Sequence, residues 1–192
     1  MPDANPAALS FLLTRRSRPA KTLVAPGPTP EQLEPILTAA ARTPDHGKLE
    51  PWRFIVVQGA AFARLSALSA ELGAAAGRDA AQIAKDRSQF DQGILAVAVV
   101  ESPKASDKVP ALEQTYSAGA VCLSLLNAAL AAGWGANWLS GWASHDAGFV
   151  QQGLGLAPHE RLAGLIHIAT EKTAPSDRPR PDLEAITTWL SA

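Results

Sequence analysis

Cysteine and metal-binding patterns are scarce in this chain. Cys122 is the one cysteine among 192 residues, so no disulfide can form within the chain. A single cysteine is typical of a reducing compartment and excludes a cysteine-rich zinc site. The four histidines show no metal-ligand spacing. We therefore expect no metal centre, a cytoplasmic location, and a Cys122 that packs as a small buried hydrophobic residue.

Charge imbalance and long apolar runs are also missing. The 17 basic and 18 acidic residues give a formal net charge of −1, which predicts neither nucleic acid nor an anionic membrane as a partner. The N-terminus lacks a charged segment followed by an apolar one, so we expect no signal peptide. The most apolar long stretch, residues 117–133, is shorter than the roughly 20 residues that span a bilayer, and it predicts a buried helix.

Several familiar catalytic motifs are absent as well. The sequence contains no Walker loop and no G-x-S-x-G elbow. Gly133-Trp134-Gly135 begins like a dinucleotide-binding fingerprint, but it follows a predicted helix, and Trp138 takes the place of the third glycine. A Rossmann domain is therefore disfavoured.

The spacing of apolar residues predicts a mixture of helices and strands. Helices are predicted at residues 6–15, between Thr29 and Pro44, at 60–76, 78–90 and 111–132, and near 145–152. Strands are predicted at 52–57, 93–100 and 161–170, with a short strand or extended turn at 135–141 and a short final element at 183–190. Because this order has no regular βαβ repeat, we expect one α+β domain over residues 1–192, with a central sheet flanked by helices.

Local signals refine these elements. Thr29, Pro30 and Gln32 form a helix start with a capping hydroxyl, and Pro35 is expected to kink that helix or remove one hydrogen bond. His167 lies inside a strand pattern, so a packed core position is favoured over a ligand role.

Three groups of basic residues are the main candidates for a site. A solvated surface, or a favourable helix dipole at the first group, explains each group alone. Together they would supply donors for a phosphorylated planar ligand, because guanidinium groups bind phosphate oxygens in pairs. The groups are Arg15, Arg16 and Arg18 with Ser17; Arg42, His46 and Lys48; and Arg178 and Arg180, with Trp52, Trp134 and Trp138 as apolar walls.

Four segments, in this order and spacing, resemble the nitroreductase family of FMN enzymes and, within it, the short YdjA-like members. They are LLTRRSRP, AARTPDHGKLEPWRFIVV, SAGAVCLSLLNAALAAGWGANWLSG, and the last strand with its RPRPDL tail. The resemblance implies a three-layer α+β sandwich with a mostly antiparallel sheet. It also implies a homodimer with FMN at the subunit interface.

The resemblance further implies roles for individual residues. Contacts to FMN are expected from Arg15, Arg16 and Ser17, with Arg15 and Ser17 near the phosphate, from Arg42 and His46, from Trp138, Leu139 and Ser140, and from Arg178 and Arg180. Lys48 would either replace the asparagine with which the family contacts the flavin ring or point into water. Arg42 and His46 would reach the flavin held by the other subunit.

Some positions depart from the family pattern. Asp45, Lys48 and Glu50 stand where the wider family has serine, asparagine and glutamine, and Pro19 replaces a basic residue. We expect these changes to alter redox properties or substrate preference more than FMN binding.

The implied activity is NAD(P)H-dependent reduction of nitroaromatics, quinones or similar acceptors by a ping-pong mechanism, with no catalytic side chain. Two alternatives stay open, an FMN store or redox sensor and a flavin-free interaction protein.

Overall fold

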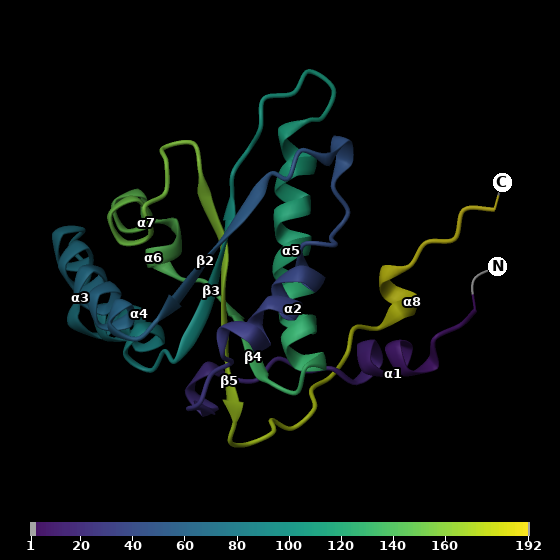
Figure 1. The fold of residues 1–192 in the computed structure, drawn as a ribbon, viewed down its shortest axis with the longest axis horizontal. Coiled ribbons are helices and arrows are strands. Elements are labelled where there is room, and N and C mark those ends of the chain that lie inside the picture. The colour runs from purple at the N-terminus through teal and green to yellow at the C-terminus, as the bar shows by residue number, and fades with distance from the viewer. Residues whose placement is uncertain (1–2, 192) are drawn as a thin grey trace.

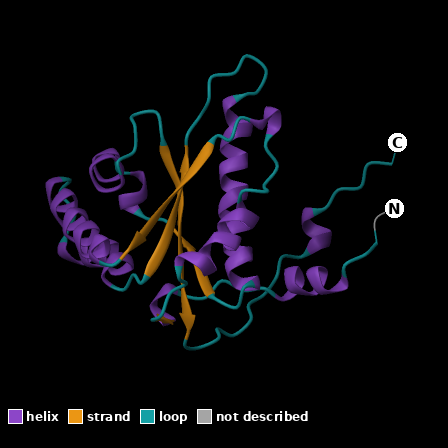
Figure 2. Cartoon of the chain, in the orientation of Figure 1, coloured by secondary structure: helices purple, strands orange, loops and turns teal. Residues whose placement is uncertain are grey.

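A five-stranded sheet forms the centre of the protein (Figures 1 and 2). The computed structural model describes residues 3–191. The strand order is β1-β5-β3-β2, and β4 pairs with β5 outside this path. The strands are β1 Leu23–Val24, β2 Trp52–Gln58, β3 Leu95–Glu101, β4 Gly135–Leu139 and β5 Arg161–Glu171. Every strand pair among the described residues is antiparallel, which confirms the predicted mostly antiparallel sheet.

Helices cover both faces of the sheet and make three layers (Figure 2). Helices α2 and α5 pack on one face, and α3, α4, α6 and α7 lie on the other (Figure 1). Helices α1 and α8 extend beyond α5, away from the sheet (Figure 1). The α-helices are α1 Pro6–Thr14, α2 Pro30–Ala40, α3 Ala60–Ala75, α4 Ala80–Asp91, α5 Ala111–Ala131, α6 Trp142–His145, α7 Ala147–Leu154 and α8 Leu183–Ile186, and the short 3-10 helices are η1 Ala20–Thr22 and η2 His46–Lys48.

Strand β3 organises the two cores. All seven of its residues are buried, as the continuous apolar pattern predicts. Successive side chains of a strand point to opposite faces. Val97 and Val99 therefore pack with α2 and α5, whereas Ala98 and Val100 pack with α3, α4 and α7.

Helix α2 begins with the predicted capping box. The Thr29 hydroxyl accepts the Gln32 N–H at 3.4 Å, and the Gln32 side chain accepts the Thr29 N–H at 3.0 Å. The helix continues through Pro35, which has no N–H to donate to the preceding turn. Asp79 and Gln82 form a second capping box at α4, which was not predicted.

Three segments differ from the predictions. The helix near 145–152 is two helices, because Asp146 is extended and its Oδ1 accepts the N–H of Phe149 at 2.7 Å, which starts α7. The proline-rich segment 19–30 contains β1, which pairs with the end of β5. Only one turn of the final element 183–190 is helical, and extended chain follows it.

Helix α5 is the predicted buried helix. Cys122 lies in it with no exposed surface, and burial raises the pKa of its thiol to about 12. The prediction of a small buried hydrophobic residue is therefore confirmed. Within residues 3–191, no helix combines the length and apolar character that a membrane crossing requires.

His167 is a core residue, as predicted. It lies in β5 between Ala96 of β3 and Asn137 of β4, and its side chain contacts the ring of Phe62. The residue is 3% exposed, and burial lowers its pKa from 6.5 to about 4. Its Nε2 has no hydrogen-bond partner among the described residues. His167 therefore belongs to the core in its neutral form.

Protonation of His167 should make folding pH-dependent. Its native pKa lies below the unfolded value of 6.5, so the unfolded chain binds the proton more readily, and stability decreases as pH falls from 6.5 towards 4. Between pH 7 and pH 5 the free energy of unfolding should fall by about 2 kcal/mol through this residue. Urea titrations at both pH values should show a smaller fall in His167→Leu and the full fall in the exposed control His159→Leu. An unchanged pH dependence in His167→Leu would contradict this assignment.

Candidate functional site

The first basic group follows the end of α1. Helix α1 stops at Thr14, and Arg15 takes an extended conformation with φ −56° and ψ 142°. The backbone N–H of Arg18 donates to the carbonyl of Ala136 at 2.8 Å, and Arg18 Nε lies 2.9 Å from Glu171 Oε2. These contacts attach the segment to the start of β4 and the end of β5. The Arg15 guanidinium also donates to the Ser17 hydroxyl at 3.2 Å.

The C-terminal basic pair joins the same place. Asp177 Oδ1 accepts the backbone N–H of Arg178 at 2.9 Å and the Arg180 guanidinium at 2.8 Å. The same oxygen lies 3.9 Å from Arg16 Nη1. Asp177 thus bridges the C-terminal segment and the segment after α1. Two of the three predicted basic groups therefore form one cluster, although they are far apart in sequence.

The electrostatics of this arginine cluster fit an anion. Burial lowers the pKa of Arg15 first, and the charges of Arg180, Arg18, Arg16 and Arg178 lower it further. Arginine stays protonated near neutral pH, so these groups repel one another. Arg15 Nε and Arg16 Nη1 are buried and donate to no acceptor among the described residues. A phosphate group would satisfy those N–H groups and relieve the repulsion.

The third basic group lies elsewhere in the chain. His46 Nδ1 is 2.6 Å from Glu113 Oε2, near the start of α5, whereas the arginine cluster contacts β4, which follows the end of α5. Figure 1 shows α1 and the 46–48 segment at opposite ends of α5. The side chains of Arg42 and Lys48 are exposed. Within one chain, the structure does not bring this group to the arginine cluster.

The loop that carries His46 has an unusual backbone. Gly47, Lys48 and Glu50 adopt positive φ angles of 76°, 55° and 48°, which are uncommon for residues other than glycine. Asp45 Oδ2 accepts the backbone N–H of Glu50 at 2.7 Å and holds this shape. Asp45, one of the departures from the family pattern, therefore has a structural role here.

Serine and threonine side chains tie the same loop to α5. Ser117 Oγ donates to the carbonyl of Pro44 at 2.9 Å and accepts the indole N–H of Trp52 at 3.2 Å. Thr43 Oγ1 lies 2.9 Å from Ser124 Oγ. The loop is therefore anchored at both ends, which leaves Lys48 displayed at its tip.

The Trp138-Leu139-Ser140 segment ends β4. Trp138 pairs with Ile166 and Leu139 with Leu165, and β4 then leaves β5. The Trp138 indole lies directly over Gly164, because a Cβ there would come within 2.1 Å of Trp138 Nε1. Any larger residue at 164 would displace the indole. Ser140 is exposed at the end of the strand.

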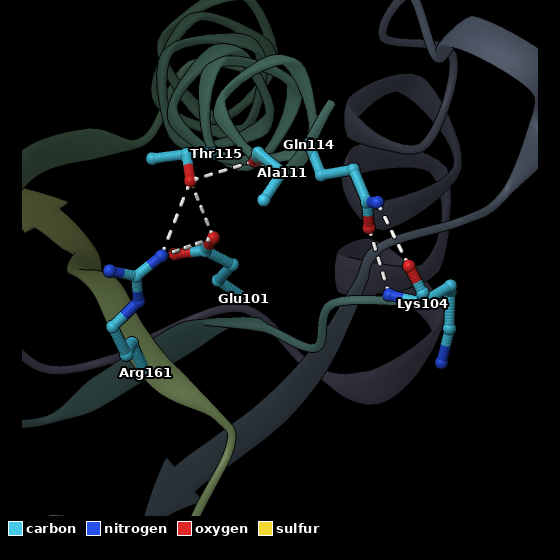
Figure 3. Close-up of polar contacts among 6 residues, drawn as sticks. All are labelled: Glu101, Lys104, Ala111, Gln114, Thr115 and Arg161. Atoms are coloured by element: carbon cyan, nitrogen blue, oxygen red, sulfur yellow. Dashed lines mark hydrogen bonds and ion pairs between the residues drawn. The ribbon is translucent and has the colours of Figure 1, made fainter. Parts of the chain in front are cut away.

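A buried polar cluster beyond β4 was not predicted. Glu101 Oε1 accepts the Thr115 hydroxyl at 2.7 Å and Arg161 Nη2 at 2.8 Å (Figure 3). Glu101 ends β3 and Arg161 begins β5, and the two residues are register partners. The sequence contained a signal for this ion pair, because an acidic residue ends one apolar strand and a basic residue begins another. Gln114 exchanges two hydrogen bonds with the backbone of Lys104, which pins the adjacent loop to α5.

Comparison with known proteins now decides the family. The model described as the Nitroreductase family matches residues 12–170. The chain belongs to the Nitroreductase family.

Two curated relatives also support an oxidoreductase. The candidate NAD(P)H nitroreductase YdjA of Escherichia coli (strain K12) is 37% identical over 163 residues, which is 85% of this chain and 87% of that protein. A candidate NAD(P)H nitroreductase of Haemophilus influenzae is 36% identical over 166 residues, with 85% and 88% covered.

Solved structures show the nitroreductase fold. A nitroreductase-like family protein from Bacillus cereus aligns with a TM-score of 0.79 at 22% identity and covers 100% of both chains. A candidate nitroreductase from Desulfovibrio desulfuricans, crystallised in complex with FMN, aligns with a TM-score of 0.75 at 20% identity, covering 99% of this chain and 100% of that one. The fold that the resemblance implied is confirmed for this nitroreductase family member.

Asp177 should compete with a bound anion for the arginine cluster. The Asp177→Asn variant removes a carboxylate that holds Arg180 and faces Arg16, so inorganic phosphate should bind roughly two- to fivefold more tightly at low salt. Calorimetric titration with phosphate measures this change. Asp107→Asn, an exposed carboxylate in the loop after β3, is the matched control. Equal or weaker phosphate binding in Asp177→Asn would count against the cluster as an anion site.

Proposed function

We propose that this nitroreductase family member is an FMN-dependent NAD(P)H oxidoreductase that reduces nitroaromatics, quinones or similar electron-poor molecules. The arginine cluster with its unpartnered buried N–H groups is the observation that carries the proposal. Such a donor set suits a phosphate ester, and FMN ends in one. The names of the YdjA relatives and the FMN complex of the Desulfovibrio desulfuricans protein support it.

The FMN phosphate would lie at Arg15, Arg16 and Ser17, with Arg178 and Arg180 closing over it. Strand β4 leads away from this point, since the arginine segment bonds to Ala136 near its start. Five extended residues span roughly 13–17 Å, which is enough to carry the flavin ring to Trp138, Leu139 and Ser140. When bound, FMN would supply the two-electron carrier that takes a hydride from NAD(P)H and passes it to the acceptor in a ping-pong cycle.

A homodimer would complete the site. Because Arg42, His46 and Lys48 lie far from the arginine cluster of their own chain, we propose that these residues of the partner subunit contact the flavin. Apolar side chains for such an interface are exposed on three helices. They are Leu9, Leu12 and Leu13 on α1, Leu112, Tyr116 and Leu123 on α5, and Leu183 and Ile186 on α8.

The residues of this chain would bind and orient rather than transfer protons. A donor from His46 or Lys48 near the N1 and C2 carbonyl edge of the flavin would favour the reduced form, where negative charge gathers. Lys48 is exposed at the tip of an anchored loop, which is consistent with such a contact. We propose no catalytic side chain, a single domain over residues 1–192 and a cytoplasmic location.

The polar groups of the 45–50 loop favour one alternative function, a flavin store or redox sensor. Asp45 and Glu50 carry carboxylates, which only accept hydrogen bonds, and the backbone N–H of Glu50 is already donated to Asp45 Oδ2, so the loop offers fewer neutral donors to a flavin ring than the family pattern does. A flavin store or redox sensor with little turnover would tolerate that loss.

The absorption spectrum of the purified protein separates these functions. We expect flavin bands that bleach when NADPH or NADH is added without oxygen and return when a nitroaromatic or quinone is added. Bands that stay oxidised would favour the store or sensor. A colourless protein that takes up no added FMN would contradict the proposed cofactor.

Arg15 should contribute directly to FMN binding. Arg15→Ala removes a charge-assisted hydrogen bond and should weaken FMN binding by about 1.5–3 kcal/mol. Fluorescence titration of FMN measures the change. Arg87→Ala is a control, because Arg87 pairs with Asp91 on α4, outside the arginine cluster. FMN affinity equal to that of the unaltered protein would remove Arg15 from the site.

A further inference from the structure

A contact with the start of α5 holds the side chain of His46. Its Nδ1 lies 2.6 Å from Oε2 of Glu113, which belongs to the first turn of α5. Among residues 3–191, this is the one hydrogen bond that the imidazole makes. The side chains of Arg42 and Lys48 form no hydrogen bond or ion pair within the same range. In the third basic group, His46 is therefore the member whose side chain is held in place.

The backbone on either side of His46 is fixed by other contacts. Ser117 Oγ donates to the carbonyl of Pro44 at 2.9 Å, two residues before His46. Gly47 packs against the loop before α5, because a Cβ there would come within 3.1 Å of Val109 Cγ2. The freedom that remains in His46 is rotation of its side chain, and the contact with α5 removes it.

The chemistry of this pair decides which imidazole nitrogen is left for a ligand. A carboxylate only accepts hydrogen bonds, so Nδ1 of His46 must carry the hydrogen that it donates to Glu113. The partner of one ring nitrogen sets the role of the other. Nε2 is therefore the atom that faces a ligand. It accepts a hydrogen bond when the ring is neutral and donates one when the ring is protonated.

A hollow of about 310 Å³ lies beside the pair. His46 and Glu113 both line it, and Tyr116, which the proposed dimer interface includes, forms another part of its wall. In the single chain the His46 side chain is 61% exposed, so a group brought by a second subunit can reach Nε2. The pyrimidine edge of a flavin carries carbonyl oxygens and one N–H, so it can pair with Nε2 in either protonation state.

We propose that Glu113 is a positioning residue, which holds His46 in the Nδ1–H tautomer with Nε2 presented to the flavin of the partner subunit. The proposal rests on the proposed function for the identity of that ligand. An imidazole that is already held loses less conformational entropy when the ligand arrives. Glu113 should therefore strengthen FMN binding, and it should do so through His46 alone.

Glu113 also interacts favourably with the dipole of α5, because it lies in the first turn of the helix. That interaction would stabilise α5 whatever His46 does. It would leave the tautomer of His46 and the affinity for FMN unchanged. The experiment must therefore observe the imidazole itself.

Nitrogen-15 NMR of the histidine rings reports the tautomer. The sample is the full-length protein freed of FMN at pH 8.5, where histidine is ordinarily neutral, and His46→Ala assigns the signals. We expect the Nδ1–H pattern for His46 and, for the exposed control His159, the Nε2–H pattern that free histidine prefers in water. Glu113→Ala should give His46 the pattern of His159. Glu71→Ala, which alters an exposed glutamate on α3, should not.

Fluorescence titration of FMN tests the link to the cofactor. Glu113→Ala and His46→Ala should each weaken FMN binding about threefold to tenfold, since each removes a positioned hydrogen bond. Because Glu113 acts through His46, adding Glu113→Ala to His46→Ala should cause no further loss. Glu71→Ala should leave the affinity for FMN unchanged.

The outcomes separate the positioning role from the proposed function. An Nε2–H pattern for His46 in the unaltered protein, or an unchanged pattern in Glu113→Ala, would overturn the positioning role even with FMN bound normally. Additive losses of FMN affinity in the double variant would also overturn it, because Glu113 would then act apart from His46. If the protein takes up no FMN but Glu113→Ala changes the tautomer, the hold on His46 stands and the proposed function fails.

Discussion

The burial of β3 on both faces is the constraint on which the rest of the structure depends. An antiparallel strand often has one face in water, but residues 95–100 of β3 are all apolar and need cover on both sides. Helices α2 and α5 supply one cover, and α3, α4 and α7 supply the other. Strand β5 beside it must then also be buried, which places His167 in the core and makes the segments at the ends of β4 and β5 the places where polar groups gather.

Helix α5 separates those polar groups into two regions. Its start holds the 43–52 loop through Ser117 and Glu113, and its end leads into β4 and the arginine cluster. A ligand that touches both regions cannot be held by one chain in this conformation. The geometry of the single subunit is thus the physical reason for proposing a shared site, and the apolar side chains exposed on α1, α5 and α8 are available to the second copy.

Two kinds of electrostatic environment lie at opposite ends of β4. The arginine cluster has more positive than negative groups, with buried N–H groups that lack partners, so it suits an anion. Beyond the other end of β4, each buried carboxylate is paired with an arginine, Glu101 with Arg161 and Glu160 with Arg53.

The sequence by itself determined the class of fold, the capping of α2, the core positions of Cys122 and His167, and which basic residues were worth attention, because these follow from local spacing and residue chemistry. The sequence did not reveal that the helix near 145–152 is interrupted at Asp146. The spacing of apolar residues there is continuous, but the Asp146 carboxylate accepts a backbone N–H and starts a new helix. Only the tertiary structure decided that Arg178 and Arg180 meet Arg15 while His46 does not. It also decided that Glu101 and Arg161 meet, because antiparallel pairing brings together residues 60 positions apart. Such contacts depend on strand order and register, which residue spacing along the chain does not encode.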